Sequence, residues 1–290
     1  MNGHASPRRW LALAAPLPAL LLGALVMRRA GLPAALWGQN LAAGLVLAAV
    51  CACLPAGAFL RGRSSWWRVA AATALGLLVA TFFNPDSAGV HRWVQAGPLR
   101  VHAGAICLPA LILALDARLC RPGDLRCWLP VSLVGGVTLI LLAAQPDAAQ
   151  ATAFAGALLT LLILRREPRS VVALVGLIAA GMVAWAWKRP DPLRPVPYVE
   201  GIVGLAALNG AHWQATALLT LALLPLPFLL GWRNGGPAAP ALGTYLVLYL
   251  LGSALGAFPV PVMGFGLSPV VGYFIALGWL AARQGEGQDA

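Results

Sequence analysis

Long apolar runs alternate with short polar gaps along the whole chain. Each run is close to the roughly 20 residues that an α-helix needs to cross the ~30 Å hydrocarbon layer of a membrane. Polar and apolar residues do not alternate one by one within the runs, as they would in strands of a membrane barrel. The pattern therefore predicts about ten membrane-spanning helices, which cover approximately residues 11–27, 34–60, 66–83, 99–115, 128–144, 148–164, 170–187, 213–232, 237–257 and 264–282.

The composition agrees with this prediction. Hydrophobic residues make up 60% of the 290 residues, charged residues make up 10%, and the mean hydropathy is +0.80. Soluble domains carry about 25% charged residues, which cover their surface with polar groups. We therefore expect an all-α polytopic integral membrane protein in which residues 1–290 form a single transmembrane domain.

Basic residues set the expected orientation. The net charge is +11, but Lys and Arg are spread over the short gaps instead of forming one basic face, which argues against a nucleic-acid partner. Thirteen of the 20 Lys and Arg residues lie in one set of alternate gaps and seven in the other. Cytoplasmic gaps are the richer ones, so we expect both ends in the cytoplasm, with a short tail at 283–290. The long gap at about 188–212 then faces outward.

The cysteines do not predict a disulfide framework or a metal site. Three of them, Cys51, Cys53 and Cys107, lie in apolar runs, where cysteine behaves as a small hydrophobic residue. Cys120 and Cys127 flank a gap that the charge pattern places in the cytoplasm, a reducing compartment. We therefore expect all five as free thiols. The sequence indicates no cofactor, although a divalent cation would suit phosphate chemistry.

Two outward gaps hold candidate chemistry. Arg92, Trp93 and Arg100 occupy the first, where an indole can anchor at the headgroup level and guanidinium groups can hold phosphate. An ordinary interfacial anchor is the alternative. The second gap is Gln145-Pro146-Asp147, in which Asp147 is the only charge. Asp147 is either the N-cap of the next helix or a buried polar node.

The third outward gap is the longest and is rich in proline. Four prolines between residues 190 and 197 predict a stiff, extended segment. Asp191 is expected to be solvated within it. Glu200 lies in an apolar setting and is a candidate for chemistry, and His212 and Gln214 follow in a moderately apolar stretch.

These gaps resemble the SEDS family (shape, elongation, division and sporulation), which includes the cell-wall polymerases RodA and FtsW. Residues 89–98 read G-x-x-R-W-V-x-x-G-P and are similar to the family's outer loop G-x-x-R-W-I-x-x-G-P. Gln145-Pro146-Asp147 matches the family's Q-P-D motif, and Gln39 resembles a glutamine that opens its second span. Residues 261–269 resemble its P-x-x-G-x-x-L-P with one extra residue. The resemblance implies a ten-helix bundle with both ends in the cytoplasm.

The chain also departs from the family pattern. A Phe-Gln-Pro-Ser-Glu sequence after the first loop is replaced by residues 101–105, Val-His-Ala-Gly-Ala. The outer loop before the eighth span is shorter, and Gln214 stands where the resemblance places the family's catalytic Asp. A glutamine cannot accept a proton at neutral pH. Glu200 and then Asp147 are the remaining candidate bases.

The resemblance implies a function in bacterial cell-wall growth, cell shape or cell division. We expect a multi-pass protein of the bacterial cytoplasmic (inner) membrane that binds a polyprenyl-linked peptidoglycan precursor, with weakened or lost polymerase activity. Its implied protein partner is a single-span class B penicillin-binding protein. The candidate substrate-binding residues are Arg92, Trp93, Arg100, His212 and Gln214.

Two alternatives remain from the sequence. One is an active peptidoglycan glycosyltransferase that uses Glu200 or Asp147 as its base. The other is a flippase or transporter of a lipid-linked precursor, although the predicted spans hold few of the ionisable residues that transporters use.

Overall fold

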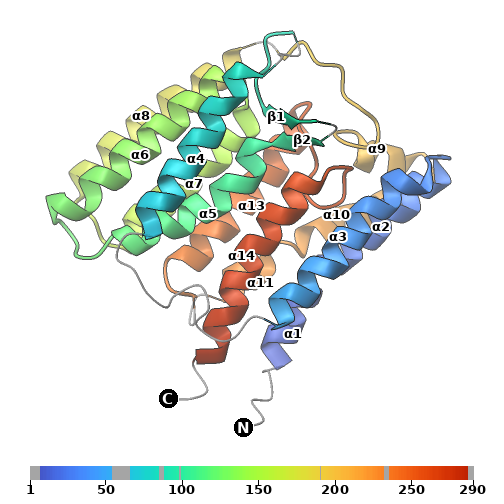
Figure 1. Ribbon diagram of the computed structural model, residues 1–290, viewed down its shortest axis with the longest axis horizontal. Helices are drawn as coiled ribbons and strands as arrows, with labels where there is room; N and C mark the ends of the chain where they lie inside the picture. The colour runs from blue at the N-terminus through green and yellow to red at the C-terminus, as the bar shows by residue number, and fades with distance from the viewer. Residues whose placement is uncertain are drawn as a thin grey trace.

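The computed structural model describes residues 7–53, 66–84, 88–97, 99–189, 191–231 and 235–286. These residues form a bundle of helices with a small β-hairpin at one end (Figure 1). The elements are, in chain order, α1 (Pro7–Ala14), α2 (Leu17–Arg29), α3 (Ala34–Cys53), α4 (Trp66–Ala80), the 3-10 turn η1 (Thr81–Phe83), β1 (Trp93–Ala96), β2 (Leu99–His102), α5 (Ala103–Arg118), α6 (Leu125–Ala144), α7 (Ala148–Leu164), α8 (Arg169–Lys188), α9 (Ile202–Ala207), α10 (Ala211–Ala222), α11 (Leu226–Leu230), α13 (Ala238–Leu255) and α14 (Leu267–Glu286).

The helices have the length and composition of membrane spans. In the described part of the chain, seven helical stretches are long and apolar enough to cross a membrane: Arg9–Arg29, Ala34–Cys53, Trp66–Phe83, Leu125–Ala144, Arg169–Lys188, Ala211–Leu230 and Ala238–Leu255. Two further apolar helices, Ala148–Leu164 and Leu267–Arg283, are shorter than these seven. The prediction of an all-α polytopic membrane protein is therefore confirmed.

Each of the ten predicted runs overlaps a helical stretch, although residues 54–60 of the second run and Trp232 of the eighth lie outside the described residues. α1 packs against α14, and α1 and the C-terminal end of α14 lie at the same end of the bundle (Figure 1). An even number of crossings requires this arrangement. The number of spans and their orientation stay predictions.

The fourth predicted run begins differently from the expectation. It was expected to be helical from residue 99, but Leu99–His102 is a strand that pairs antiparallel with Trp93–Ala96. Gly97 turns the chain between these strands at φ +60°, a conformation that glycine adopts without strain. The helix α5 begins only at Ala103, because the hairpin uses the four preceding residues.

α7 is the central helix of the bundle. It packs against α5, α6, α8 and α13, and most of its side chains are buried. Small residues allow this close approach, as expected for helices that pack in a membrane. A Cβ atom on Gly252 of α13 would lie 2.9 Å from the Cβ of Ala149, and a Cβ atom on Gly272 of α14 would overlap the carbonyl oxygen of Ala105.

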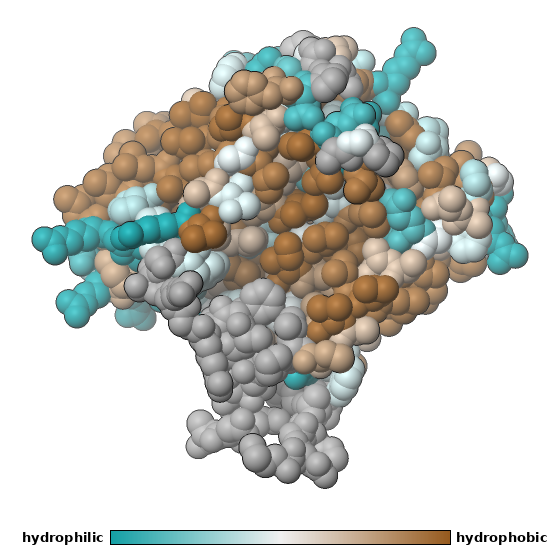
Figure 2. Space-filling view, viewed as in Figure 1, coloured by the Kyte–Doolittle hydropathy of each residue, from teal (hydrophilic) through white to brown (hydrophobic). Residues whose placement is uncertain are grey.

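The outer surface of the bundle is apolar. Large side chains such as Leu11, Val69 and Leu177 are mostly exposed, which suits contact with lipid rather than water. Figure 2 shows hydrophobic residues over most of the visible sides, with hydrophilic residues gathered near the edges. This distribution is typical of a protein surrounded by hydrocarbon.

The expectation of five free cysteines is wrong for two of them. Cys120 and Cys127 form a disulfide bond across the segment between α5 and α6. The segment turns back at Gly123, which has φ +76°, and this turn brings the two side chains together. Cys51, Cys53 and Cys107 are free, as predicted.

Candidate functional site

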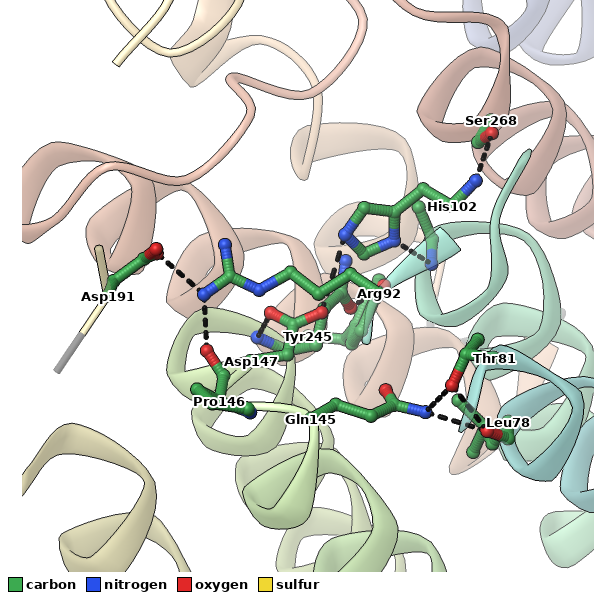
Figure 3. Close-up of polar contacts among 12 residues, drawn as sticks. Leu78, Thr81, Arg92, His102, Gln145, Pro146, Asp147, Asp191, Tyr245 and Ser268 are labelled. Atoms are coloured by element: carbon green, nitrogen blue, oxygen red, sulfur yellow. Dashed lines mark hydrogen bonds and ion pairs between the residues drawn. The ribbon is translucent and has the colours of Figure 1, made fainter. Parts of the chain in front are cut away.

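The predicted site residues lie at the end of the bundle that carries the hairpin. The hairpin, the α6–α7 turn, the segment from Asp191 to Gly201 and the residues before α14 meet there (Figures 1 and 3). The sequence placed these gaps on one face of the membrane, and the structure brings them together.

Arg92 is buried and ties three segments to one another. Its Nη2 atom donates to Asp191 Oδ2 at 2.6 Å and to the carbonyl oxygen of Pro146. Its guanidinium group also lies over the ring of Phe258, 4.7 Å from the centroid. Arg92 is only 1% exposed, and its role in substrate binding stays a prediction. Asp191, expected to be solvated, is instead its ionic partner.

The Gln145-Pro146-Asp147 turn is fixed by hydrogen bonds on both sides. The Gln145 side chain donates from Nε2 to the carbonyl oxygen of Leu78 and to Thr81 Oγ1, at 2.8 and 2.9 Å. Asp147 caps α7, since its Oδ1 accepts from the backbone N–H of Gln150 at 3.3 Å. It is also 1% exposed. Asp147 is thus both a helix cap and a buried polar node, the two readings that the sequence left open.

His102 is a titratable neighbour of Asp147. Its Nε2 lies 3.4 Å from Asp147 Oδ2 (Figure 3). Its Nδ1 accepts from the backbone N–H of Ala105, so His102 caps α5, and the backbone N–H of His102 donates to Ser268 Oγ. An accepting Nδ1 leaves the proton of the neutral ring on Nε2, the nitrogen that lies 3.4 Å from the carboxylate oxygen. Burial lowers the pKa of His102, and the neighbouring Asp147 offsets only part of that effect.

Sequence reasoning missed His102 and the polar chain that continues inward from Asp147. Tyr245 on α13 donates its hydroxyl to Gln150 Oε1 at 2.6 Å, and Gln150 belongs to the first turn of α7. The only signal for His102 was a polar residue near the start of the fourth apolar run, where an N-cap can lie. Tyr245 gave no signal, because aromatic residues are common in apolar helices.

Glu200 has a different environment. Its Oε2 accepts from the backbone N–H of Val196 at 2.8 Å, and burial raises the pKa of its carboxyl group. It lines a cavity of about 660 Å³ whose other walls are almost entirely apolar. These walls come from α9, α10, α11 and α13, and include Leu218, Leu226 and Leu251, which are themselves exposed on the apolar surface. The cavity therefore opens toward the lipid side of the bundle.

The remaining predicted substrate residues lie apart from this cavity. Trp93 and Arg100 sit on the hairpin, where the Arg100 guanidinium group lies 5.0 Å from the indole centroid. His212 and Gln214 are exposed on the first turn of α10, and neither is among the described residues that line the cavity. Their roles in substrate binding stay predictions.

Candidate metal ligands gather elsewhere. Among the described residues, the only group of three His, Cys, Asp or Glu side chains close enough to share an ion is Cys120, Asp124 and Cys127. This group lies at the other end of α5 from His102. The contact of His102 with Asp147 offers two such groups, fewer than the three protein ligands of a typical catalytic zinc site.

The bundle defines a polytopic membrane protein, and solved structures show that its fold is SEDS-like. The crystal structure of the rod shape determining protein RodA from Thermus thermophilus matches with a TM-score of 0.67 and 20% identity, over 95% of this chain and 96% of that one. A mutant form of the same protein gives the same values. A chain of a peptidoglycan synthase complex, described for the coordination of polymerization and crosslinking, matches with a TM-score of 0.63 and 19% identity, over 96% and 97%.

No family profile and no curated protein sequence matches this chain. At 20% identity the structural likeness establishes the fold, which is RodA-like over nearly the whole chain.

Proposed function

We propose that this protein binds a polyprenyl-linked peptidoglycan precursor in the membrane and serves bacterial cell-wall growth or division, with weakened or lost polymerase activity. The observation that carries the proposal is the apolar cavity of about 660 Å³ with the Glu200 carboxyl group on its wall. Ligand cavities typically measure about 300–1,000 Å³ and combine apolar walls with a few polar groups.

The position of the cavity suits a lipid-linked ligand. Exposed leucines at its rim face the hydrocarbon, so an isoprenoid chain can enter sideways without crossing water. Glu200 precedes α9 in the outward segment and supplies an acceptor for hydroxyl or amide groups near the head of such a ligand. The polar head of the ligand would then lie at the outer surface of the membrane, and its apolar tail would lie between the helices.

The predicted catalytic groups argue for weak turnover. Glycosyl transfer with loss of polyprenyl pyrophosphate needs a base for a sugar hydroxyl and cations for the pyrophosphate. Arg92 is committed to Asp191 and Pro146, Asp147 is buried against His102, and Gln214 is not a base. Gln214 is also exposed and lies away from the cavity, which further supports weak turnover.

Glu200 supports a second candidate, an active glycosyltransferase. Burial raises the pKa of this carboxyl group, which makes it a better proton acceptor than an exposed glutamate. In that reaction a sugar hydroxyl would lose its proton to Glu200 and attack the anomeric carbon of a second precursor, and polyprenyl pyrophosphate would leave.

One experiment separates the two candidates. The full chain is reconstituted in nanodiscs with radiolabelled lipid-linked disaccharide, and bound precursor and polymer are both measured. We expect binding without polymer, reduced by Ala222→Phe or Ala254→Phe, which narrow the cavity. Ala180→Phe on the exposed face of α8 is the matched control and should bind normally. Polymer from the native chain that is lost in Glu200→Gln would establish the glycosyltransferase, and equal binding by all variants would refute the cavity as the site.

The cellular setting follows from the same proposal. We place the protein in the bacterial cytoplasmic membrane, beside a single-span class B penicillin-binding protein. The likeness to a chain of a peptidoglycan synthase complex supports this partner class. Crosslinking in membranes followed by mass spectrometry tests it, and recovery of no transpeptidase among the crosslinked proteins would contradict it.

A further inference from the structure

The disulfide between Cys120 and Cys127 lies at the end of the bundle opposite the hairpin. Cys120 is exposed and Cys127 is buried. Cys120 lines a cavity of about 230 Å³ together with Trp279 and Arg283 near the end of α14. The bond therefore belongs to the same end of the molecule as the C-terminal end of the last helix.

This end carries the arginine-rich gaps that the sequence assigned to the cytoplasm. The segment from α5 to α6, the α7–α8 turn and the end of α14 contribute basic side chains here, namely Arg118, Arg121, Arg126, Arg165, Arg166 and Arg283. The positive-inside tendency places them in the cytoplasm. Thiols of the cytosol reduce exposed disulfides, and bonds that form there are usually transient or redox-sensing.

We propose that Cys120 and Cys127 are a reversible thiol–disulfide pair that exchanges with low-molecular-weight thiols and disulfides of the cytosol. A small thiolate attacks the exposed Sγ of Cys120, forms a mixed disulfide with it and releases Cys127 as a thiolate. A second small thiolate then attacks the mixed disulfide, releases Cys120 as a thiolate and leaves as the small disulfide. The reverse sequence, with a small disulfide as oxidant, closes the bond again.

The surroundings of both sulfur atoms favour this exchange. The Arg118 guanidinium group donates from Nη1 to Cys120 Sγ at 3.7 Å, and a cation at that position stabilises a thiolate. Cys127 lies in the first turn of α6, a helix of 20 residues whose N-terminal end carries partial positive charge. Each sulfur therefore has a positive group that favours its thiolate, and the exposed sulfur of Cys120 is the accessible target.

Metal binding is the competing use of the same side chains. Ligand atoms of Cys120, Asp124 and Cys127 lie within 4.8 Å of one another, so the reduced pair could approach an ion. The guanidinium group beside Cys120 opposes a divalent cation there, whereas it favours a thiolate. The charge at the site therefore supports redox exchange.

The state of the bond is coupled to the neighbouring helices. The backbone N–H of Gly123, inside the closed segment, donates to Glu167 Oε2 at 2.9 Å, and Glu167 lies on the α7–α8 turn. The bond holds Gly123 in its turn, so reduction should loosen this contact. Hydrogen exchange of residues 119–127 should become faster on reduction in the native chain and stay constant in Cys120→Ser, which lacks the bond in both conditions.

Thiol counting in living cells tests the proposal. Cells that express the full chain are treated with diamide, a thiol oxidant, or with dithiothreitol. They are quenched with acid, and free thiols are labelled with maleimide-polyethylene glycol. We expect a gain of two labelled thiols on reduction, retained in Cys53→Ser and abolished in Cys120→Ser. In glutathione buffers the purified protein should pass from bonded to open as the ratio of thiol to disulfide rises through the cytosolic range.

Three results would overturn the proposal. A disulfide that stays intact at cytosolic ratios of glutathione to its disulfide would be structural. Two cysteines that remain free thiols after diamide would not form a reversible disulfide pair. Zinc that copurifies with the reduced native chain and is lost in Cys120→Ser would identify a metal site instead. As a further check, Arg118→Gln should slow alkylation of the reduced protein several-fold, while Arg169→Gln on the neighbouring helix should leave the rate unchanged.

Discussion

The ion pair between Arg92 and Asp191 allows a sharp test of the geometry at the hairpin end of the bundle. Asp191→Asn keeps the shape of the side chain but removes its charge. The Arg92 side chain is 1% exposed, so its guanidinium group would lose its ionic partner and keep neutral contacts, which include the Pro146 carbonyl and the Phe258 ring. Removing one partner of a buried pair typically costs about 3–5 kcal/mol, because the other charge is left uncompensated.

The exposure of Asp191 sets where in that range the effect falls. Its side chain is 18% exposed, so water can reach the vacated position and solvate part of the guanidinium charge. We therefore expect a loss near the lower end, about 3 kcal/mol of unfolding free energy. Arg194→Gln, an exposed change on the same segment, should stay within about 0.5 kcal/mol of the native chain.

The assay is equilibrium unfolding in mixed micelles, with a double variant to isolate the buried charge. Arg92→Met together with Asp191→Asn removes both charges and so leaves no orphaned guanidinium group. The double variant should be more stable than Asp191→Asn alone. If Asp191→Asn unfolds like Arg194→Gln, or if the double variant is the less stable, then Arg92 is not held by this pair and the reasoning is refuted.

Three further predictions concern the neighbouring contacts. Burial lowers the pKa of His102, so the unfolded chain binds a proton first as the pH falls, and the unfolding free energy should drop below about pH 6.5. His102→Asn, which can still cap α5, should flatten this pH dependence. An unchanged slope would contradict the assignment of the pH dependence to His102. Gln145→Leu removes the amide donor from Thr81 Oγ1 and from the Leu78 carbonyl oxygen, which still accepts from Thr81 Oγ1, and should cost about 1 kcal/mol in the same assay; a neutral result would mean that the Gln145 amide does not fix the turn. Gly272→Ala should cost about 1–3 kcal/mol because its Cβ overlaps a backbone oxygen of α5, whereas Gly181→Ala, which meets open space, should be neutral or stabilising; equal effects would exclude close α5–α14 packing.

The helices were predictable because their determinants are local. A run of apolar residues must be long enough to cross hydrocarbon and must satisfy its own backbone hydrogen bonds, and both conditions can be seen in a window of about 20 residues. α7 illustrates this, since the predicted run and the observed helix have the same bounds, Ala148–Leu164, with Asp147 as its cap. Where the local rule failed, at Leu99–His102, a hairpin turn at Gly97 changed the start of the helix.

The candidate site was only partly predictable. Asp147 stood out as the one charge in its turn, and Glu200 as an acid in apolar surroundings. Arg92 was selected as well, but for the wrong environment: it was expected to be available to phosphate and is instead buried. Its partner Asp191 lies 99 residues away along the chain, in a proline-rich gap that looked solvated.

By itself, the sequence determined that this chain is a helical membrane protein and where most of its apolar helices lie, because hydrocarbon length acts on each segment separately. Only the tertiary structure decided the contact of His102 with Asp147, the burial of Arg92, the placement of Glu200 on the wall of an apolar cavity and the bond between Cys120 and Cys127. These features depend on which side chains meet across separate segments. The free energy of burying a charge or a polar group is set by those partners, and no local pattern records them.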